Sequence, residues 1–200
     1  MEDNRRGLWL AYGLWFNFWL VLLTLILGTL IIISTLFQPQ GTLGRRISRV
    51  WGGLLLKILG ISVTVEGLER LVPGQTYVFA ANHRSQFDIF VLLMMLPGDF
   101  GWVAKKSLFQ LPIFGQALSR LGNVSIDRQN LQDAIKSLNH AANLVQGGHS
   151  LVVFPEGTRA TSRELLPFKK GVFIMALKVH RAIADHFDPD YPYGTDNSQS

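Results

Sequence analysis

The chain has 200 residues, a formal net charge of +5 and no cysteine. This length suits one domain of ordinary size with an additional attached segment. The lack of cysteine excludes disulfides, thiolate metal sites and a cysteine nucleophile. Basic side chains outnumber acidic ones between residues 45 and 181, which favours an anionic partner such as membrane phosphate or nucleic acid.

The first predicted element is a long apolar segment. Residues 7–44 contain no charged side chain, so the run exceeds the ~20 residues that a helix needs to cross the bilayer core. A cleaved signal peptide has a shorter apolar region that ends in small residues, which this segment does not supply. We therefore predict a membrane anchor over residues 1–44, as either one spanning helix or two short helices that enter one leaflet.

Basic residues on the two sides of the apolar segment predict its orientation. Only Arg5 and Arg6 precede it. The basic residues that follow it are Arg45, Arg46, Arg49 and Lys57. This excess predicts that the main domain lies on the cytoplasmic face of the membrane. We expect the four side chains to attract lipid head groups.

Residues 47–59 form the next predicted helix. Its apolar side chains recur at helical spacing with basic residues between them. The pattern is typical both of an amphipathic helix at a membrane interface and of a helix packed on a domain core. The strict alternation of residues 61–67 then predicts a half-buried strand.

Strand and helix patterns alternate along the rest of the chain. The predicted strands are the short apolar runs at 76–81, 100–105, 122–127 and 149–154. The predicted helices between them cover residues 86–96, 113–121 and 130–146. This alternation predicts an α/β domain over residues 45–184, with a mixed sheet and flanking helices. The polar tail at residues 185–200 is expected to be disordered.

The turn after the strand predicted at 76–81 carries the sequence NHRSQFD, residues 82–88. Ser85 followed three residues later by Asp88 is a capping box, which accounts for both residues structurally. The same placement allows a hydrogen bond between the Asp88 carboxylate and the imidazole of His83. Such a pair fixes the histidine tautomer and leaves its other nitrogen free to accept a proton. This stretch alone leaves open whether it is a capped turn or a catalytic pair.

Basic side chains stand at the ends of three other predicted strands. They are Lys105, Arg128 and Arg159, the last in a turn with Glu156 and Gly157. Guanidinium and ammonium groups beside a helix N-terminus can together hold a phosphate. An ordinary solvated basic loop is the alternative for the last turn taken alone. Four strand ends that offer a base, a carboxylate and cations resemble a site at the carboxyl edge of a sheet.

Three sequence blocks occur in order along the chain: NHRSQFD (82–88), GNVSIDR (122–128) and FPEGTRA (154–160), with KKSLFQLPIFG between the first two. Together they resemble the glycerophospholipid acyltransferases, specifically the 1-acyl-glycerol-3-phosphate acyltransferases. The resemblance extends from about residue 45 to residue 178. It implies that His83 is the catalytic base and Asp88 its orienting partner. The substrate-binding residues that it implies are Lys105, Arg128, Glu156, Gly157 and Arg159.

We therefore expect an enzyme that transfers a fatty acyl group to the 2-hydroxyl of 1-acyl-glycerol-3-phosphate (lysophosphatidic acid), giving phosphatidic acid in phospholipid synthesis. The acyl donor, acyl-CoA or acyl carrier protein, is the co-substrate, and no metal or other cofactor is expected. Membrane lipid is an expected partner and nucleic acid is not. Another lysophospholipid or glycerol-3-phosphate remains an alternative acceptor.

The chain departs from the family pattern after the helix near residues 170–178. Members of the family continue into an apolar strand of the Val-Pro-Ile-Val-Pro type, whereas this sequence becomes polar and lacks that fourth block. A truncated inactive form or a non-enzymatic membrane-associated protein therefore remains an alternative. Ser85 raises the alternative of a serine hydrolase, which is disfavoured because the sequence has no G-x-S-x-G motif. A nucleic-acid binder is disfavoured because no aromatic and basic platform motif occurs.

Overall fold

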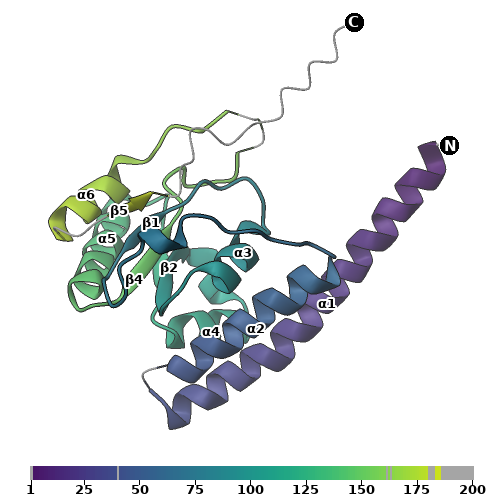
Figure 1. The fold of residues 1–200 in the computed structure, drawn as a ribbon, viewed down its shortest axis with the longest axis horizontal. Helices are drawn as coiled ribbons and strands as arrows, with labels where there is room; N and C mark the ends of the chain where they lie inside the picture. The colour runs from purple at the N-terminus through teal and green to yellow at the C-terminus, as the bar shows by residue number, and fades with distance from the viewer. Residues whose placement is uncertain (1, 40, 161, 163, 180–182, 186–200) are drawn as a thin grey trace, which may run out of the picture.

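The fold is an α/β unit preceded by two long helices (Figure 1). The computed structural model describes residues 2–39, 41–160, 162, 164–179 and 183–185. The helices are α1 (Glu2–Phe37), α2 (Thr42–Ile58), α3 (Asp88–Met95), α4 (Phe114–Arg120), α5 (Leu131–Gln146) and α6 (Lys170–Val179). The strands are β1 (Val78–Ala80), β2 (Phe100–Lys105), β3 (Val124–Ile126), β4 (Ser150–Val153) and β5 (Ile183–Asp185).

The sheet has the strand order β3-β2-β4-β1-β5, and every described pairing is parallel. Val152 of β4 lies between Phe79 of β1 and Trp102 of β2. The predicted α/β class is confirmed, although the sheet is parallel and not mixed. The reason is that a helix joins each strand to the next, and such a crossover returns the chain to the same edge of the sheet.

Helices cover both faces of the sheet. On one face, β1 and β4 pack against α5 and α6 through a core that includes Val78, Val153, Val145 and Met175. On the other face, Phe79 and Trp102 belong to a cluster with Leu92 and Leu93 of α3. Strands buried on both faces read as continuous apolar runs, which is why the sequence predicts these strands well. The α5 prediction is also confirmed, with Asn130 as its N-cap.

The predicted strand at residues 61–67 is absent, and the structure has an irregular segment without ladder pairing there. The burial of these residues does alternate, and Ile61 and Val63 pack on a cluster that contains Leu55 and Phe90. Alternation therefore correctly gave the face that points inward. It could not show whether this segment pairs with another strand, because pairing depends on a distant part of the chain.

A fifth strand follows α6, where the sequence shows no strand pattern. Residues 183–185 of β5 pair in parallel with Val78–Ala80 of β1. The missed strand is three residues long, which is too short for a period-2 pattern to stand out. The predicted disordered tail begins at Asp185, but this residue is the last of β5. The rest of the predicted tail, residues 186–200, lies outside the described residues.

Helix α1 is continuous through Asn17 and Gly28, so a break into two short helices does not occur within it. The chain turns after Phe37, and α2 then packs along α1 (Figure 1). Gly52 of α2 lies so close to α3 that a Cβ there would be 3.2 Å from the Phe90 carbonyl oxygen. One side of the second helix thus packs on the domain, and its interfacial role at a membrane stays a prediction.

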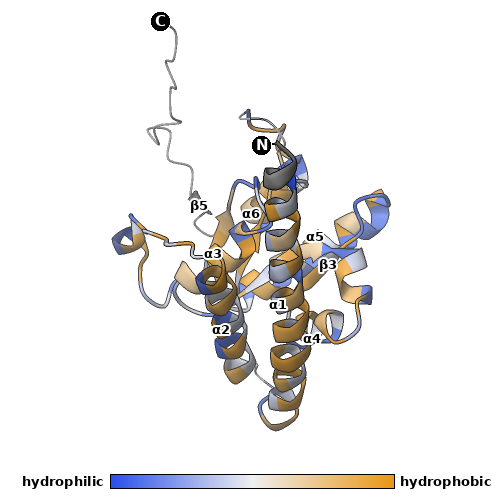
Figure 2. Ribbon diagram, turned by 90° about the vertical axis from the view of Figure 1, so that its right-hand side faces the viewer, coloured by the Kyte–Doolittle hydropathy of each residue, from blue (hydrophilic) through white to orange (hydrophobic). Residues whose placement is uncertain are grey.

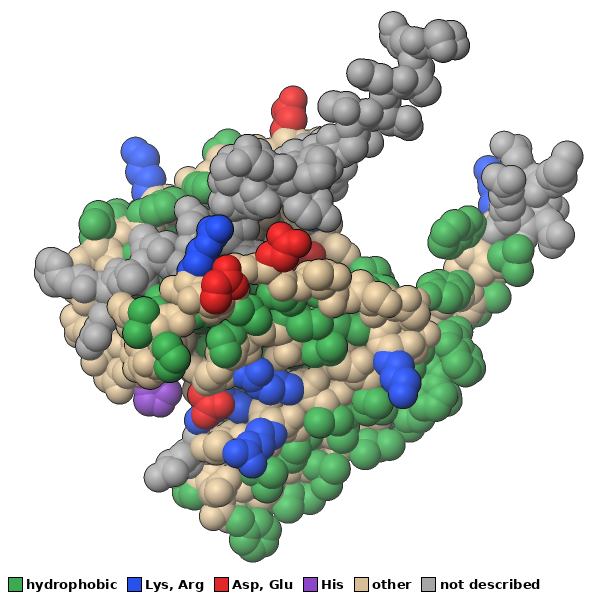
Figure 3. All heavy atoms as spheres, in the orientation of Figure 1, with side chains coloured by type: hydrophobic (Ala, Val, Ile, Leu, Met, Phe, Trp, Pro, Cys, Tyr) green, Lys and Arg blue, Asp and Glu red, His purple; other side chains and the backbone are tan. Residues whose placement is uncertain are grey.

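The outer face of α1 is apolar and exposed. Arg6–Phe37 is long and apolar enough to cross a membrane, by length and composition. Hydrophobic residues predominate along the helix in Figure 2, and hydrophobic side chains line the edge that it forms in Figure 3. The outward side chains include Leu14, Phe18 and Leu25. This surface indicates a membrane protein.

Two of the four basic residues expected to contact lipid head groups are instead used inside the protein. The Arg49 guanidinium donates to the carbonyl oxygens of Leu96, at 2.7 Å, and of Gly98. Arg45 forms an ion pair with Asp99 at 3.1 Å. Both interactions fasten α2 to the loop between α3 and β2. Arg46 and Lys57 remain exposed on α2.

Candidate active site

The candidate site lies at the carboxyl edge of the parallel sheet. His83 follows β1, Lys105 ends β2, Arg128 follows β3 and Glu156 follows β4. Parallel strands point the same way, so turns distant in sequence meet at this edge. The structure brings these residues to one edge of the sheet, where the sequence predicts the site.

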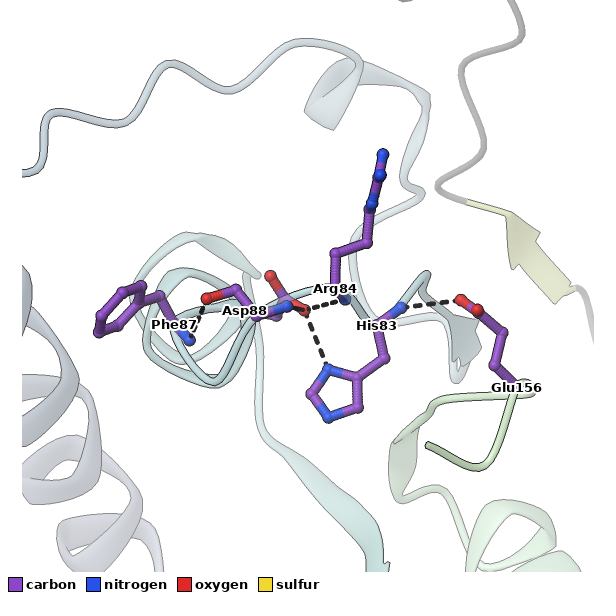
Figure 4. Close-up of polar contacts among 6 residues, drawn as sticks. His83, Arg84, Phe87, Asp88 and Glu156 are labelled. Carbon is purple, nitrogen blue, oxygen red and sulfur yellow. Dashed lines mark hydrogen bonds and ion pairs between the residues drawn. The ribbon is translucent and has the colours of Figure 1, made fainter. Parts of the chain in front are cut away.

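His83 and Asp88 form a direct pair (Figure 4). The Nδ1 of His83 lies 2.9 Å from Oδ2 of Asp88. Because a carboxylate can only accept, Nδ1 carries the proton and Nε2 is left as the acceptor. The pair forms because His83 precedes the helix while Asp88 is the first residue of α3 and tilts back toward it.

The same Asp88 oxygen also caps the turn. It accepts from the backbone N–H groups of Arg84, at 2.8 Å, and Ser85, at 2.9 Å. Partial burial by itself raises the pKa of Asp88, but the hydrogen bonds from His83, Ser85 and Arg84 lower it below the ordinary value. One carboxylate therefore holds the His83 ring and orders the turn before α3, whose N-cap Phe87 has no side-chain capping hydrogen bond. The box is not reciprocal, because the Ser85 hydroxyl accepts from Phe87 at 3.2 Å.

The segment after β4 surrounds His83 from the other side. The backbone N–H of His83 donates to Oε1 of Glu156 at 3.0 Å (Figure 4), and its carbonyl accepts from Ala160 N–H at 2.8 Å. The imidazole stacks on the Phe154 ring, with centroids 4.0 Å apart. Trp102 stacks on Phe154 in turn.

Glu156 and Gly157 do not line the cavity in front of His83. The Glu156 side chain is buried, and its second oxygen accepts from Leu166 N–H at 3.1 Å. Gly157 has φ of 75°, a left-handed conformation that glycine adopts without strain. Both residues thus shape the turn that presents Arg159.

A cavity of about 590 Å³ opens in front of His83. Three predicted substrate-binding residues line it together with His83, namely Lys105, Arg128 and Arg159. Partial burial lowers the pKa of Arg128, which nevertheless stays protonated at neutral pH. The cavity continues between the helices over apolar side chains that include Ile31, Trp51, Leu93, Phe114, Ala117 and Leu121. The arrangement pairs a proton acceptor and cationic groups with a space suited to a hydrocarbon chain.

Sequence reasoning missed several groups around the site. Phe154 was read as part of a buried strand, yet its ring lies under the imidazole of His83. Thr158 and Gln86 also line the cavity. Thr158 is adjacent to Arg159, and Gln86 lies between His83 and Asp88. Their positions within these motifs are the only sequence feature that could have predicted them. No motif in α1 predicts that its residues line the cavity.

A parallel α/β sheet with a His–Asp pair and convergent cations at its carboxyl edge defines the class of protein. Residues 62–194 match the family model described as Acyltransferase, and the chain belongs to that family.

Individual relatives carry a more specific name. The chain is 32% identical over 189 residues to "1-acyl-sn-glycerol-3-phosphate acyltransferase" of Limnanthes douglasii, covering 91% of this chain and 66% of that protein. It is 38% identical over 148 residues to the protein of the same name from Saccharomyces cerevisiae, covering 72% and 48%. The chain thus spans between about half and two thirds of the length of these two curated relatives.

A solved structure has the same fold. The crystal structure of the "1-acyl-sn-glycerophosphate (LPA) acyltransferase, PlsC, from Thermotoga maritima" aligns with a TM-score of 0.75 at 24% sequence identity. The alignment covers 92% of this chain and 73% of that one. The uncovered share of this chain is smaller than α1, so the alignment includes at least part of that helix.

Proposed function

We propose that the protein transfers a fatty acyl group from acyl-CoA or acyl carrier protein to the 2-hydroxyl of 1-acyl-glycerol-3-phosphate, giving phosphatidic acid. The observation that carries this proposal is the His83–Asp88 pair at the mouth of a partly apolar cavity beside Lys105, Arg128 and Arg159. The names of the relatives support the choice of acceptor.

The chemistry assigns a role to each catalytic group. His83 Nε2 takes the proton of the acceptor hydroxyl as its oxygen attacks the thioester carbonyl. The tetrahedral intermediate then expels the thiolate, which takes the proton from the imidazolium, so an ester forms and a thiol leaves. Asp88 stabilises the imidazolium and holds its orientation. The thioester is already an activated acyl group, so we propose that no metal or other cofactor takes part.

The remaining roles concern binding. The cations at the cavity mouth bind the acceptor phosphate through charge-assisted hydrogen bonds, with Arg128 and Arg159 as the main contacts and Lys105 beside them. The apolar part of the cavity takes hydrocarbon from a substrate. Because α1 forms one wall of this cavity, the acceptor can be drawn from the bilayer while its head group stays at the interface. We place residues 45–184 on the cytoplasmic face, where acyl-CoA and acyl carrier protein are soluble.

The test is an acyl transfer assay with purified protein in vesicles, beside His83→Ala. We expect activity with 1-acyl-glycerol-3-phosphate that falls by about 10²–10⁴-fold in the variant, the usual range for a general base. Glycerol-3-phosphate and lysophosphatidylcholine serve as competing acceptors, and the two donors are compared directly. Equal turnover by wild type and His83→Ala would reject the mechanism. No transfer by folded wild-type protein would favour a non-enzymatic role.

The phosphate contacts are tested in the same assay. Arg159→Ala and Arg128→Ala should mainly raise the apparent KM for 1-acyl-glycerol-3-phosphate, because a contact to the unreacting phosphate forms equally in the ground and transition states. The KM for the acyl donor should change little. Lys136→Ala, on the exposed face of α5, is the control for simple loss of charge. Equal loss of affinity for both substrates would contradict a phosphate contact.

A further inference from the structure

The Glu156 carboxylate lies behind the catalytic turn and not in the cavity. Its residue is 2% exposed, and it does not belong to the cavity lining. In Figure 4 its side chain reaches the backbone nitrogen of His83, on the side away from the Asp88 contact. We propose that Glu156 is a positioning residue for His83 and does not contact the acceptor. This inference rests on the proposed function.

Both oxygens of Glu156 already have hydrogen-bond donors. Oε1 accepts from His83 N–H at 3.0 Å, and Oε2 accepts from Leu166 N–H at 3.1 Å. A buried carboxylate is tolerated only when such bonds replace its hydration. An acceptor hydroxyl would have to reach a side chain that is covered and to displace one of these donors. The geometry therefore opposes a binding role and supports a bracing role.

Glu156 is the centre of a brace that holds His83 at three points. The other two are Ala160 N–H, which donates to the His83 carbonyl, and the Phe154 ring, which stacks on the imidazole. All three groups come from residues 154–160. Asp88 holds the ring and the Arg84 N–H of the peptide group that follows His83. Glu156 binds the N–H of the peptide group that precedes His83, and Ala160 binds the His83 carbonyl.

The brace links the base to the phosphate site. Arg159 lies between Glu156 and Ala160 in sequence, so the segment that presents the phosphate contact also fixes His83. A displacement of about 1 Å at a catalytic group can lower the rate by about 10²-fold. Loss of the Glu156 carboxylate should therefore lower kcat, while the cations that bind the phosphate remain in place.

The experiment compares Glu156→Gln with Arg159→Ala in the vesicle assay, with 1-oleoyl-glycerol-3-phosphate and palmitoyl-CoA as probes. Glutamine keeps the size of the side chain but offers one acceptor oxygen to two N–H donors. We expect kcat to fall by about tenfold to 10²-fold with the acceptor KM within about twofold of wild type, because the lost interaction misplaces the base. Arg159→Ala should instead raise the acceptor KM and leave kcat nearly unchanged. A rise in acceptor KM with kcat retained, or no change in either constant, overturns the proposal.

Amide hydrogen exchange gives a second, independent readout. In the wild-type protein the His83 and Leu166 amides should exchange slowly both with and without 1-oleoyl-glycerol-3-phosphate. Release of either amide when the acceptor binds would show that Glu156 turns to the ligand, and would overturn the proposal. This measurement holds even if Glu156→Gln does not fold. It also separates the two proposals, since a wild-type protein that transfers no acyl group defeats the proposed function while exchange still decides the position of Glu156.

Discussion

The Oδ2 atom of Asp88 accepts three hydrogen bonds, one from the His83 ring and two from backbone N–H groups. A single atom thus orders the helix start and the imidazole together. Both tasks favour the charged carboxylate, because a protonated acid is a weaker acceptor. The residue that looks like a simple cap in the sequence is therefore fully compatible with a catalytic role.

Asp88→Asn separates these two tasks. The asparagine oxygen can still accept from the backbone N–H groups, but an amide does not stabilise an imidazolium. We expect acyl transfer to fall by about 10²–10⁴-fold, as for loss of a general base, in a protein that still folds. Initial rates and a thermal unfolding curve on the same preparation check this. Activity that falls only in proportion to the folded fraction would restrict Asp88 to capping.

The lowered pKa of Asp88 also predicts the pH dependence of stability. A carboxyl whose pKa is lower in the folded protein adds stability above its ordinary pKa of 3.8, and this contribution is lost as the pH falls through the lower folded value. Asp88→Asn lacks the titrating group. The difference in Tm between wild type and variant should therefore be largest near neutral pH and shrink below about pH 4, the ordinary range of the group. A difference that stays constant down to acid pH would contradict this assignment.

At the scale of elements, close packing of α2 on α3 decides where small residues are needed. Gly52 faces the Phe90 backbone, with the carbonyl oxygen 3.2 Å from where a Cβ would stand. The adjacent Gly53 faces only the Met94 sulfur, at 3.5 Å. Both lie inside the same helix, so an alanine gains the same helix propensity at each position.

The two glycines make a matched pair of substitutions. Gly53→Ala should raise the free energy of unfolding by up to about 1 kcal/mol through helix propensity. Gly52→Ala should leave the protein less stable than Gly53→Ala by about 1–3 kcal/mol, because its methyl group overpacks against backbone. Denaturant midpoints of the two variants in detergent micelles measure the difference. Equal stabilisation by both would mean that α2 and α3 separate easily.

The pattern of apolar residues along the sequence predicted the buried strands and the amphipathic helix. The β1, β2 and β4 strands are buried on both faces and were found from their apolar runs, and α5 was found from its amphipathic period and its stop at Gly147. The strand predicted at 61–67 is wrong, and the short β5 was not predicted. Both depend on pairing with a neighbour that is distant in sequence. His83 and Asp88 were placed correctly because they lie in one turn. The buried setting of Glu156 depends on Leu166 and on another turn, and no pattern in its own stretch encodes that.

At the scale of the whole molecule, α1 has two apolar faces with different tasks. The inner face contributes Thr24, Gly28 and Ile31 to the cavity, and the outer face is exposed. Deletion of the helix would alter both at once. Substitution of outward residues changes the membrane face alone.

We expect the triple substitution Leu14, Phe18 and Leu25→Gln to weaken attachment. Burial of a leucine or phenylalanine side chain in lipid contributes about 1.5–3 kcal/mol, so loss of the three should release much of the protein from vesicles in a flotation assay. Activity on vesicle-bound acceptor should fall more than activity on a short-chain monomeric acceptor. The control triple Leu131, Ile174 and Leu177→Gln changes exposed apolar residues of α5 and α6. Equal release of both variants, or of neither, would contradict α1 as the attachment.

Because α1 also forms part of the cavity wall, another membrane helix could not simply replace it. An unrelated spanning helix grafted in its place would keep the protein on the membrane but would not supply the notch at Gly28, where a Cβ would come within 2.8 Å of the Ile113 side chain. One side of α1 exposes apolar side chains and the opposite side borders the cavity, so forces that lipid exerts on this helix act on the cavity wall. The thickness and lateral pressure of the bilayer are therefore expected to act on the shape of the cavity as well as on attachment.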